Sequence, residues 1–152
     1  KCKSPKAFDE LIKLKDKPSW KNQSLISTLN GLKELGDPRG AELALTALTD
    51  SRSPHWTLAI PVWDHRLAAA ETLRALGFCC RGYELVIVQF NKAMDENNIN
   101  DIFYNVVCLT ALADPRAEHI FDLLTAKFAG DPVILPAIEQ YRQQFISTVK
   151  SN

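Results

Sequence analysis

Apolar residues recur at every third or fourth position over most of the chain, which is the spacing of one face of an amphipathic helix. In three places the pattern takes the same form, with four apolar residues at steps of three and a leucine at the end. The sets are Ile26, Leu29, Leu32 and Leu35; Leu67, Ala70, Leu73 and Leu76; and Phe103, Val106, Leu109 and Leu112. Their final leucines follow one another at steps of 41 and 36 residues. The pattern predicts a helical unit that is repeated three times.

The turns after the first and third sets carry the same tripeptide, Asp-Pro-Arg, at 37–39 and 114–116. An aspartate in this place can accept hydrogen bonds from free backbone N–H groups of a helix start, and a proline is tolerated at the first helical position. Asp131-Pro132 repeats this signal before the last predicted helix. The middle unit has no such cap between Gly77 and Gly82, so we expect a looser or longer turn there.

The predicted fold class is therefore all-α, with strand signals thin along the whole chain. Two-helix units with periods of roughly 40–47 residues are typical of HEAT-type repeats, which bury their apolar faces by stacking on one another. We expect a single domain over residues 1–152, a HEAT-like α–α superhelix (solenoid) of about three helical pairs plus terminal helices. The expected helices are 5–15, 20–35, 38–49, 64–76, 82–95, 100–112, 115–128 and 132–148.

The charge balance gives little support to a nucleic acid or an acidic membrane as the partner. The formal net charge is zero, with 18 basic and 18 acidic residues, and such partners favour a basic surface. No apolar run approaches the roughly 18 residues of a membrane span. The chain begins with Lys1, so we expect it to be an excised part of a longer protein, and the sequence indicates no compartment.

No catalytic, metal-ligating or cofactor-binding residue is predicted in this chain. His55, His65 and His119 do not begin an HExxH motif, and there is no GxSxG elbow or glycine-rich phosphate loop. The spacing of Cys2, Cys79, Cys80 and Cys108 fits neither a zinc ribbon nor a CxxC pair. We expect Cys108 to be a buried reduced thiol. The oxidation state of the adjacent pair, Cys79 and Cys80, stays open.

Arginines after the turns are the most informative polar residues. Arg39 and Arg116 hold equivalent places, and Arg66 follows Asp64 at the start of a first helix. We expect a structural ladder in which these arginines pair with aspartates of adjoining units, and a ligand-binding row is the alternative. The proline-bracketed segment 50–62 adds an aromatic and a histidine. The candidate interaction surface is Arg39, His55, Trp56, Arg66 and Arg116.

The stretch SWKNQSLISTLNGLKELGDPRGAELAL resembles the C-terminal helical-repeat region of bacterial aminopeptidase-N-type zinc metallopeptidases. The residues that carry the resemblance are Ser19, Trp20, Leu29, Gly31, Leu32, Leu35, Asp37 and Arg39. HRLAAAETLRALG is similar to a general HEAT pattern through Arg66, Ala69, Ala70, Leu73, Leu76 and Gly77. The resemblance covers roughly residues 8–125, and the chain departs from it in the segment 50–62 and in the uncapped middle turn.

The resemblance implies a non-catalytic domain that packs on an upstream catalytic domain of the same chain and shapes substrate access. The catalytic domain of the parent chain would then bind the zinc, and residues 1–152 would bind no metal or other cofactor. Two alternatives are a stand-alone HEAT scaffold for a protein or peptide partner and a nucleic-acid-binding HEAT-like protein. The scaffold predicts an exposed stripe on the second helix of each pair, such as Glu42, Glu84 and Glu118. The peptidase domain predicts an apolar flank.

Overall fold

In the part of the chain that the structure describes, all regular secondary structure is helical. The computed structural model describes residues 5–19, 22–50 and 64–151. The elements are α1 (Pro5–Leu14), α2 (Gln23–Leu35), α3 (Gly40–Leu48), α4 (His65–Ala75), α5 (Cys79–Asp95), α6 (Ile99–Leu112), the 3₁₀ turn η2 (Pro115–Glu118), α7 (His119–Lys127) and α8 (Ile134–Lys150). Each expected helix is found, and the all-α prediction is confirmed.

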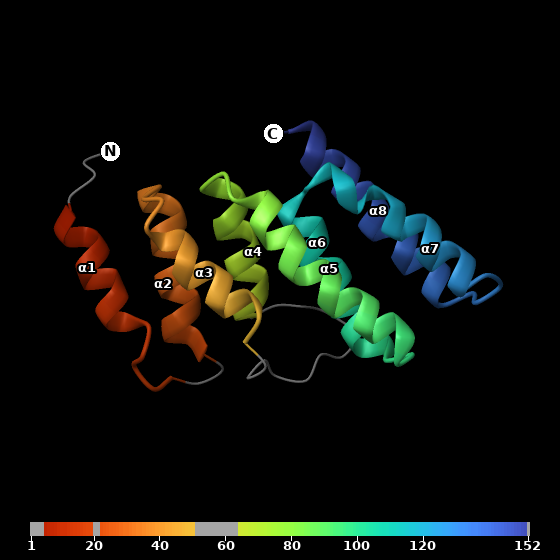
Figure 1. Cartoon of the computed structure of the whole chain (residues 1–152), viewed down its shortest axis with the longest axis horizontal. Helices are drawn as coiled ribbons and strands as arrows, with labels where there is room; N and C mark the ends of the chain where they lie inside the picture. Colours follow the sequence, from red (N-terminus) through yellow and green to blue (C-terminus); the bar gives the residue numbers. More distant parts are fainter. Residues whose placement is uncertain (1–4, 20–21, 51–63, 152) are drawn as a thin grey trace.

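The helices form two layers in an elongated molecule, with α1 at one end and α7 and α8 at the other (Figure 1). In the first layer α2, α4, α6 and α8 lie side by side, each in contact with the next. In the second layer α3 packs on α4 and on α5, α5 packs on α6, and α7 packs on α8. From α1 to α6, helices that are neighbours in sequence are therefore also neighbours in space, and the same holds for α7 and α8.

The predicted apolar sets form the contact between the layers. Leu29, Leu32 and Leu73 are fully buried, as are Phe103 and Val106 in the third set. Leu35, Leu67 and Leu76 at the ends of their sets are half-buried. Helix α6 departs from an amphipathic pattern, since every residue from Ile102 to Thr110 is buried. A helix that is apolar on all sides lies in the core rather than at the surface, and α6 holds that place here.

The predicted aspartates accept backbone N–H groups in the turns that lead into the helices. The Oδ1 atom of Asp37 accepts from the backbone N–H of Arg39 at 3.0 Å, and Asp114 does the same for Arg116 at 3.0 Å. Asp131 accepts from two backbone N–H groups before α8, both at 2.9 Å. The expected helix 115–128 is divided, because the turn after Asp114 is a 3₁₀ turn before α7 begins.

The prediction of a looser or longer middle turn is wrong. Only Leu76, Gly77 and Phe78 separate α4 from α5. Gly77 adopts a left-handed conformation, with φ at 81°, and the N–H of Phe78 donates to the carbonyl of Leu73 at 2.8 Å. This is the Schellman closure that glycine permits after a helix. Gly36 and Ala113 are left-handed after α2 and α6, with φ at 65° and 52°, so the middle unit ends its first helix as the others do and lacks the aspartate that follows.

Small residues let the two layers approach closely at the start of the second helices. A Cβ at Gly40 would lie 3.2 Å from Cβ of Leu32, and one at Gly82 would lie 3.1 Å from Cδ1 of Leu73. Leu32 and Leu73 hold the same place in their sets. Ala117, at the start of the third copy, is fully buried. The dipeptides are Arg39-Gly40, Arg81-Gly82 and Arg116-Ala117, so the middle unit keeps this signal although it lacks the aspartate.

Candidate functional site

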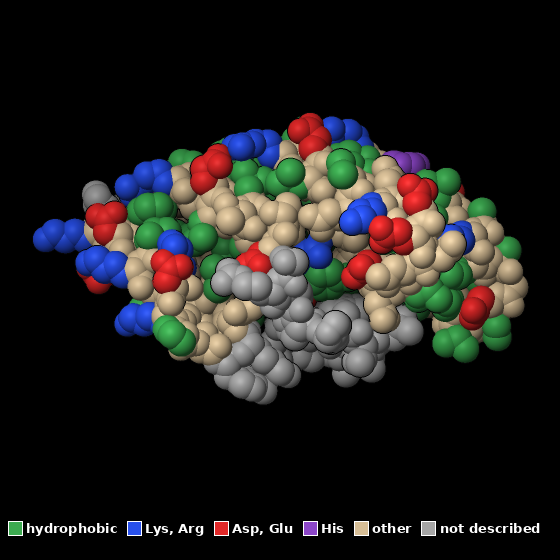
Figure 2. Space-filling view, turned by 60° about the horizontal axis from the view of Figure 1, so that its bottom comes forward, with side chains coloured by type: hydrophobic (Ala, Val, Ile, Leu, Met, Phe, Trp, Pro, Cys, Tyr) green, Lys and Arg blue, Asp and Glu red, His purple; other side chains and the backbone are tan. Residues whose placement is uncertain are grey.

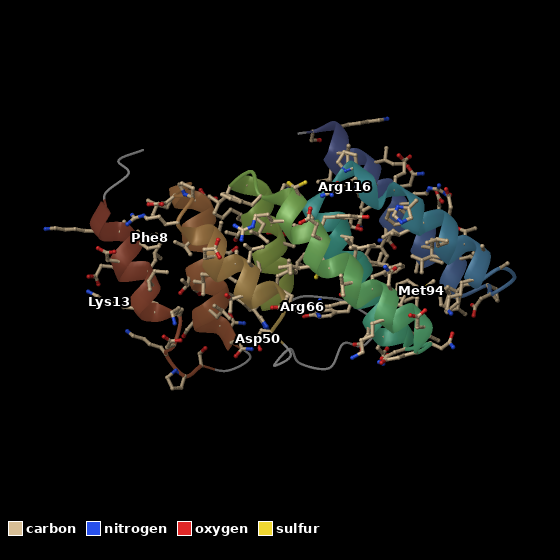
Figure 3. The ribbon with its side chains drawn as sticks, viewed as in Figure 1. Phe8, Lys13, Asp50, Arg66, Met94 and Arg116 are labelled. Atoms are coloured by element: carbon tan, nitrogen blue, oxygen red, sulfur yellow. The ribbon has the colours of Figure 1, made fainter. Side chains whose placement is uncertain are left out.

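The structure places the candidate surface residues in separate environments. Arg39 lies at the start of α3 and Arg116 at the start of η2. Arg66 lies among the helices in the middle of the molecule, away from Arg116 (Figure 3). Among the described residues, the hydrogen bonds, ion pairs and ring contacts of each arginine are made with other residues. His55 and Trp56 fall outside the described residues. The five residues are therefore not assembled into one site by the part of the chain that the structure describes.

Arg39 is held by its own turn and by α1. Its guanidinium donates to both carboxylate oxygens of Asp37, with Nη2 to Oδ2 at 2.6 Å. The guanidinium carbon lies 4.0 Å from the centre of the Phe8 ring, a cation–π distance. The hydrogen bond with Asp37 raises the pKa of Arg39. This arginine joins the start of α3 to α1.

Arg116 repeats this arrangement in the third unit. Its guanidinium donates to both oxygens of Asp114, at 2.9 Å each, and lies 4.3 Å from the centre of the Tyr83 ring on α5. It also donates to Sγ of Cys80 at 2.8 Å. The equivalent residues of units one and three thus share the aspartate of their own turn and an aromatic ring of the preceding unit.

Ion pairs between units connect the second layer. Nη1 of Arg81 lies 2.8 Å from Oε1 of Glu42, and Nη1 of Arg116 lies 3.6 Å from Oε1 of Glu84. Glu42 and Glu84 each stand two residues after the small residue of their unit. Of the three arginines expected to form a ladder, Arg116 reaches an acidic residue of the adjoining unit, and Arg81, which was not predicted, makes the other link. Their partner there is a glutamate, and the aspartates pair within their own turn because the capping geometry points them at Arg39 and Arg116.

The Asp114 carboxylate gives the ladder a pH dependence. The hydrogen bond from Arg116 holds the pKa of Asp114 below its usual value, against the effect of burial. A carboxyl with a lowered pKa stabilises the fold above its unfolded pKa, about 3.9, and the contribution is lost as pH falls through the folded value. Asp114→Asn keeps the capping oxygen but removes the charge. We expect it to lower the free energy of unfolding by about 1 kcal/mol at pH 7.

The measurement is urea unfolding of both proteins at pH 7 and at steps below pH 4. The difference between them should shrink as the wild-type carboxylate becomes protonated. Asp122→Asn is the matched control, because Asp122 is an exposed partner of Arg142 and such pairs contribute less than about 1 kcal/mol. A loss for Asp114→Asn that is independent of pH would contradict the assignment.

Arg66 is the centre of a buried polar cluster. Its side chain donates to three acceptors from three different segments: the carbonyl of Leu48 at 2.7 Å, Oε1 of Gln89 at 2.7 Å and Oδ1 of Asn105 at 2.8 Å. The guanidinium also lies 4.2 Å from the centre of the Tyr104 ring. Only 8% of Arg66 is exposed. A residue enclosed in this way joins α3, α4, α5 and α6, and it is a structural centre rather than a binding surface.

His65 and Asp64 lie beside this cluster and are also buried. The side chain of Asp64 caps α4 through the N–H of Arg66, at 2.7 Å. Nδ1 of His65 lies 3.4 Å from Nδ2 of Asn22, and its buried Nε2 has no hydrogen-bond partner among the described residues. The burial of His65 was not predicted, because the absence of a zinc motif says nothing about how a histidine packs. Its signal was its place in the first turn of an apolar helix.

The remaining reactive groups are dispersed. Cys108 is fully buried, as predicted, and burial raises the pKa of its thiol to about 12. Cys79 and Cys80 carry free thiols at the start of α5. Across residues 5–19, 22–50 and 64–151 no three His, Cys, Asp or Glu side chains gather as metal ligands would. In the same residues, none of the helices has the length and apolarity needed to span a membrane.

A groove of about 290 Å³, which no sequence pattern predicted, opens on the first layer. Helix α6 forms its floor, and α4 and α8 form its walls. The lining residues are Leu67, Glu71, Arg74, Val107, Thr110, Ala111, Tyr141, Gln144 and Thr148. Burial raises the pKa of the Tyr141 hydroxyl. The groove has an apolar floor and a mostly polar rim, which is the composition of many ligand pockets.

Comparisons with known proteins do not assign this arrangement to a family. No family model matches the chain, and neither a curated protein nor a solved structure matches it.

Proposed function

We propose that the chain is a HEAT-like helical-repeat domain that acts by binding another protein and has no reaction centre of its own. The arginine ladder carries this proposal. Arg81 with Glu42 and Arg116 with Glu84 join successive second helices through equivalent positions, at 2.8 Å and 3.6 Å. Stacked repeats in which each unit contacts its neighbours produce this recurrence, and such proteins present extended binding surfaces.

The exposed residues favour a scaffold. Glu42, Glu84 and Glu118 are all exposed, as a stripe along the second helices requires. At the two ends of the stack the exposed side chains are mostly polar. On the terminal helices they are Lys6, Asp9, Glu10 and Lys13 of α1 and Glu139, Gln140, Gln143, Gln144, Ser147 and Lys150 of α8. The exposed apolar residues at these ends include Leu14 on α1, Leu123 on α7, and Val133 and Pro136 at the start of α8. Terminal helices with a polar outer side are typical of repeat proteins that end in water.

A second candidate function is the C-terminal domain of an aminopeptidase-N-type zinc metallopeptidase, packed on the catalytic domain that binds the zinc. The sequence resemblance over residues 19–39 supports it. In this chain the residues of that motif have structural roles. Leu29 and Leu32 are fully buried, a Cβ at Gly31 would lie 2.6 Å from Cδ2 of Leu11, and Asp37 caps a turn with Arg39. These roles account for the motif without a peptidase, so we place the scaffold first.

The charge distribution does not favour the nucleic-acid alternative. Figure 2 shows acidic and basic side chains interspersed over the face in view, with no basic stripe. Nucleic-acid binding depends on clustered Lys and Arg that displace counterions from the phosphates.

The test is a peptide selection on the purified chain. Random peptides displayed on phage are selected on the immobilised protein, and the enriched sequence is synthesised and titrated by fluorescence anisotropy. We expect a consensus that binds at micromolar concentration and a scrambled peptide that does not. Equal binding of the scrambled peptide, or no consensus, would contradict the proposal. So would cleavage of the selected peptides by the purified chain, because a scaffold has no hydrolytic centre.

A further inference from the structure

The groove between α4 and α8 contains a buried hydroxyl with no hydrogen-bond partner. Thr110 lines its floor and is 7% exposed, and its Oγ1 is buried and unpartnered among the described residues. Other threonines within the helices donate to the carbonyl four residues before them. These are Thr28, Thr46, Thr72, Thr125 and Thr148. A buried hydroxyl without a partner costs about 1–3 kcal/mol, so an acceptor that reaches Thr110 would offset this cost.

The rim of the groove has an unbalanced positive charge. Two ionised side chains line it, Glu71 and Arg74. Glu71 is paired with Lys33 of α2, at 2.8 Å between Nζ and Oε2. Arg74 makes no ion pair with any described residue, and it is half-buried on the wall formed by α4. A half-buried guanidinium beside an apolar floor is a complement for a carboxylate.

The floor and the far wall add apolar contact and hydrogen bonding. Val107, Ala111 and Leu67 offer an apolar surface, and Gln144 of α8 faces them with a side-chain amide that can both donate and accept. The volume of about 290 Å³ is at the lower end of ligand pockets, so it fits one or two side chains and not a folded domain. An apolar side chain can fill such a floor while a neighbouring acidic side chain reaches the rim.

We propose that this groove binds a short peptide segment in which an apolar side chain is adjacent to an aspartate or glutamate. The apolar side chain packs on Val107 and Ala111, a backbone carbonyl of the peptide accepts from the Thr110 hydroxyl, and the carboxylate pairs with Arg74. The inference rests on the proposed function and specifies its site and the chemistry of the partner.

The experiment compares three variants against one probe, a fluorescein-labelled peptide that carries the consensus of the selection above. Arg74→Glu should weaken binding at least tenfold, and a peptide with lysine in place of its acidic residue should regain affinity for this variant. Lys92→Glu is the matched control, because it makes the same charge change on α5, on the other layer, and should leave affinity unchanged. The consensus itself should contain an acidic residue beside an apolar one.

Thr110→Val tests the hydroxyl separately. It should raise the thermal stability of the free chain, because it removes a buried unpartnered polar group, and it should weaken peptide binding several-fold. Binding to Arg74→Glu and Thr110→Val at wild-type affinity would overturn the groove proposal and leave the scaffold proposal intact. Failure to select any peptide would overturn both.

Discussion

Replacing Arg66 by methionine is expected to lower the free energy of unfolding by about 3 kcal/mol, the largest effect of any single polar substitution considered for this chain. Methionine preserves the aliphatic volume and removes the guanidinium. The carbonyl of Leu48 and the side-chain oxygens of Gln89 and Asn105 then lose their donor inside the molecule. In a protein of this length that loss corresponds to a decrease in Tm of about 6–12 °C.

Two variants separate this effect from a general loss of charge. Arg142→Met removes an arginine from α8 whose partner Asp122 is exposed, and it should cost less than about 1 kcal/mol. Arg66→Lys retains the charge, but an ammonium group lacks the planar set of N–H donors with which the guanidinium bonds three acceptors. The stability of this variant should therefore lie between that of Arg66→Met and that of the wild type. Chemical denaturation by circular dichroism measures all three. An Arg66→Met protein within about 0.5 kcal/mol of the wild type would show that the cluster is not a structural centre.

Replacing Gly82 by valine is expected to destabilise the fold by about 2–3 kcal/mol. Substituting a helical glycine ordinarily stabilises a helix, because glycine is about 1 kcal/mol less favourable there than alanine. At this position a Cβ would lie 2.6 Å from Cδ2 of Leu112 and 3.1 Å from Cδ1 of Leu73. Both leucines are fully buried, so neither side chain has room to move away. The free-energy cost of this steric clash therefore exceeds the gain from the higher helix propensity of the new residue.

Asn91→Val is the matched control for the change at Gly82. It introduces the same β-branched residue on the same helix, at an exposed position of α5. It should change the free energy of unfolding by no more than about 0.5 kcal/mol. If Gly82→Val were neutral or stabilising in the same experiment, the close approach of α5 to α4 and α6 would be wrong.

Most of the fold could be predicted because its signals are local. Spacings of three and four residues predict the helices, and Asp37, Asp114 and Asp131 mark turns by capping chemistry that involves only the next three residues. The middle turn was predicted wrongly although its signal was present. Gly77 directly follows a run of helical apolar positions, which is the place of a left-handed glycine.

The contacts of the arginines could not be predicted in the same way. Arg66 meets Gln89 and Asn105, which come from two later helices, and nothing near Arg66 in the sequence points to either. The links between units were predictable in principle. Arg81-Gly82 repeats the dipeptide Arg39-Gly40. Because no Asp-Pro precedes Arg81, the correspondence of the two positions is hard to recognise in the sequence. The groove is formed by residues of three helices that are distant in the sequence, so no local pattern predicts it.

The enclosure of α6 restricts how this protein can change during evolution. An inserted residue rotates all following positions of a helix by roughly 100° about its axis. A helix with a solvent-exposed face can accept this, because some of the displaced side chains then point into solvent. From Ile102 to Thr110 no such face exists. Insertions should therefore be accepted in the connections between helices and at α1, where no described side chain is fully enclosed, and not within the central helix.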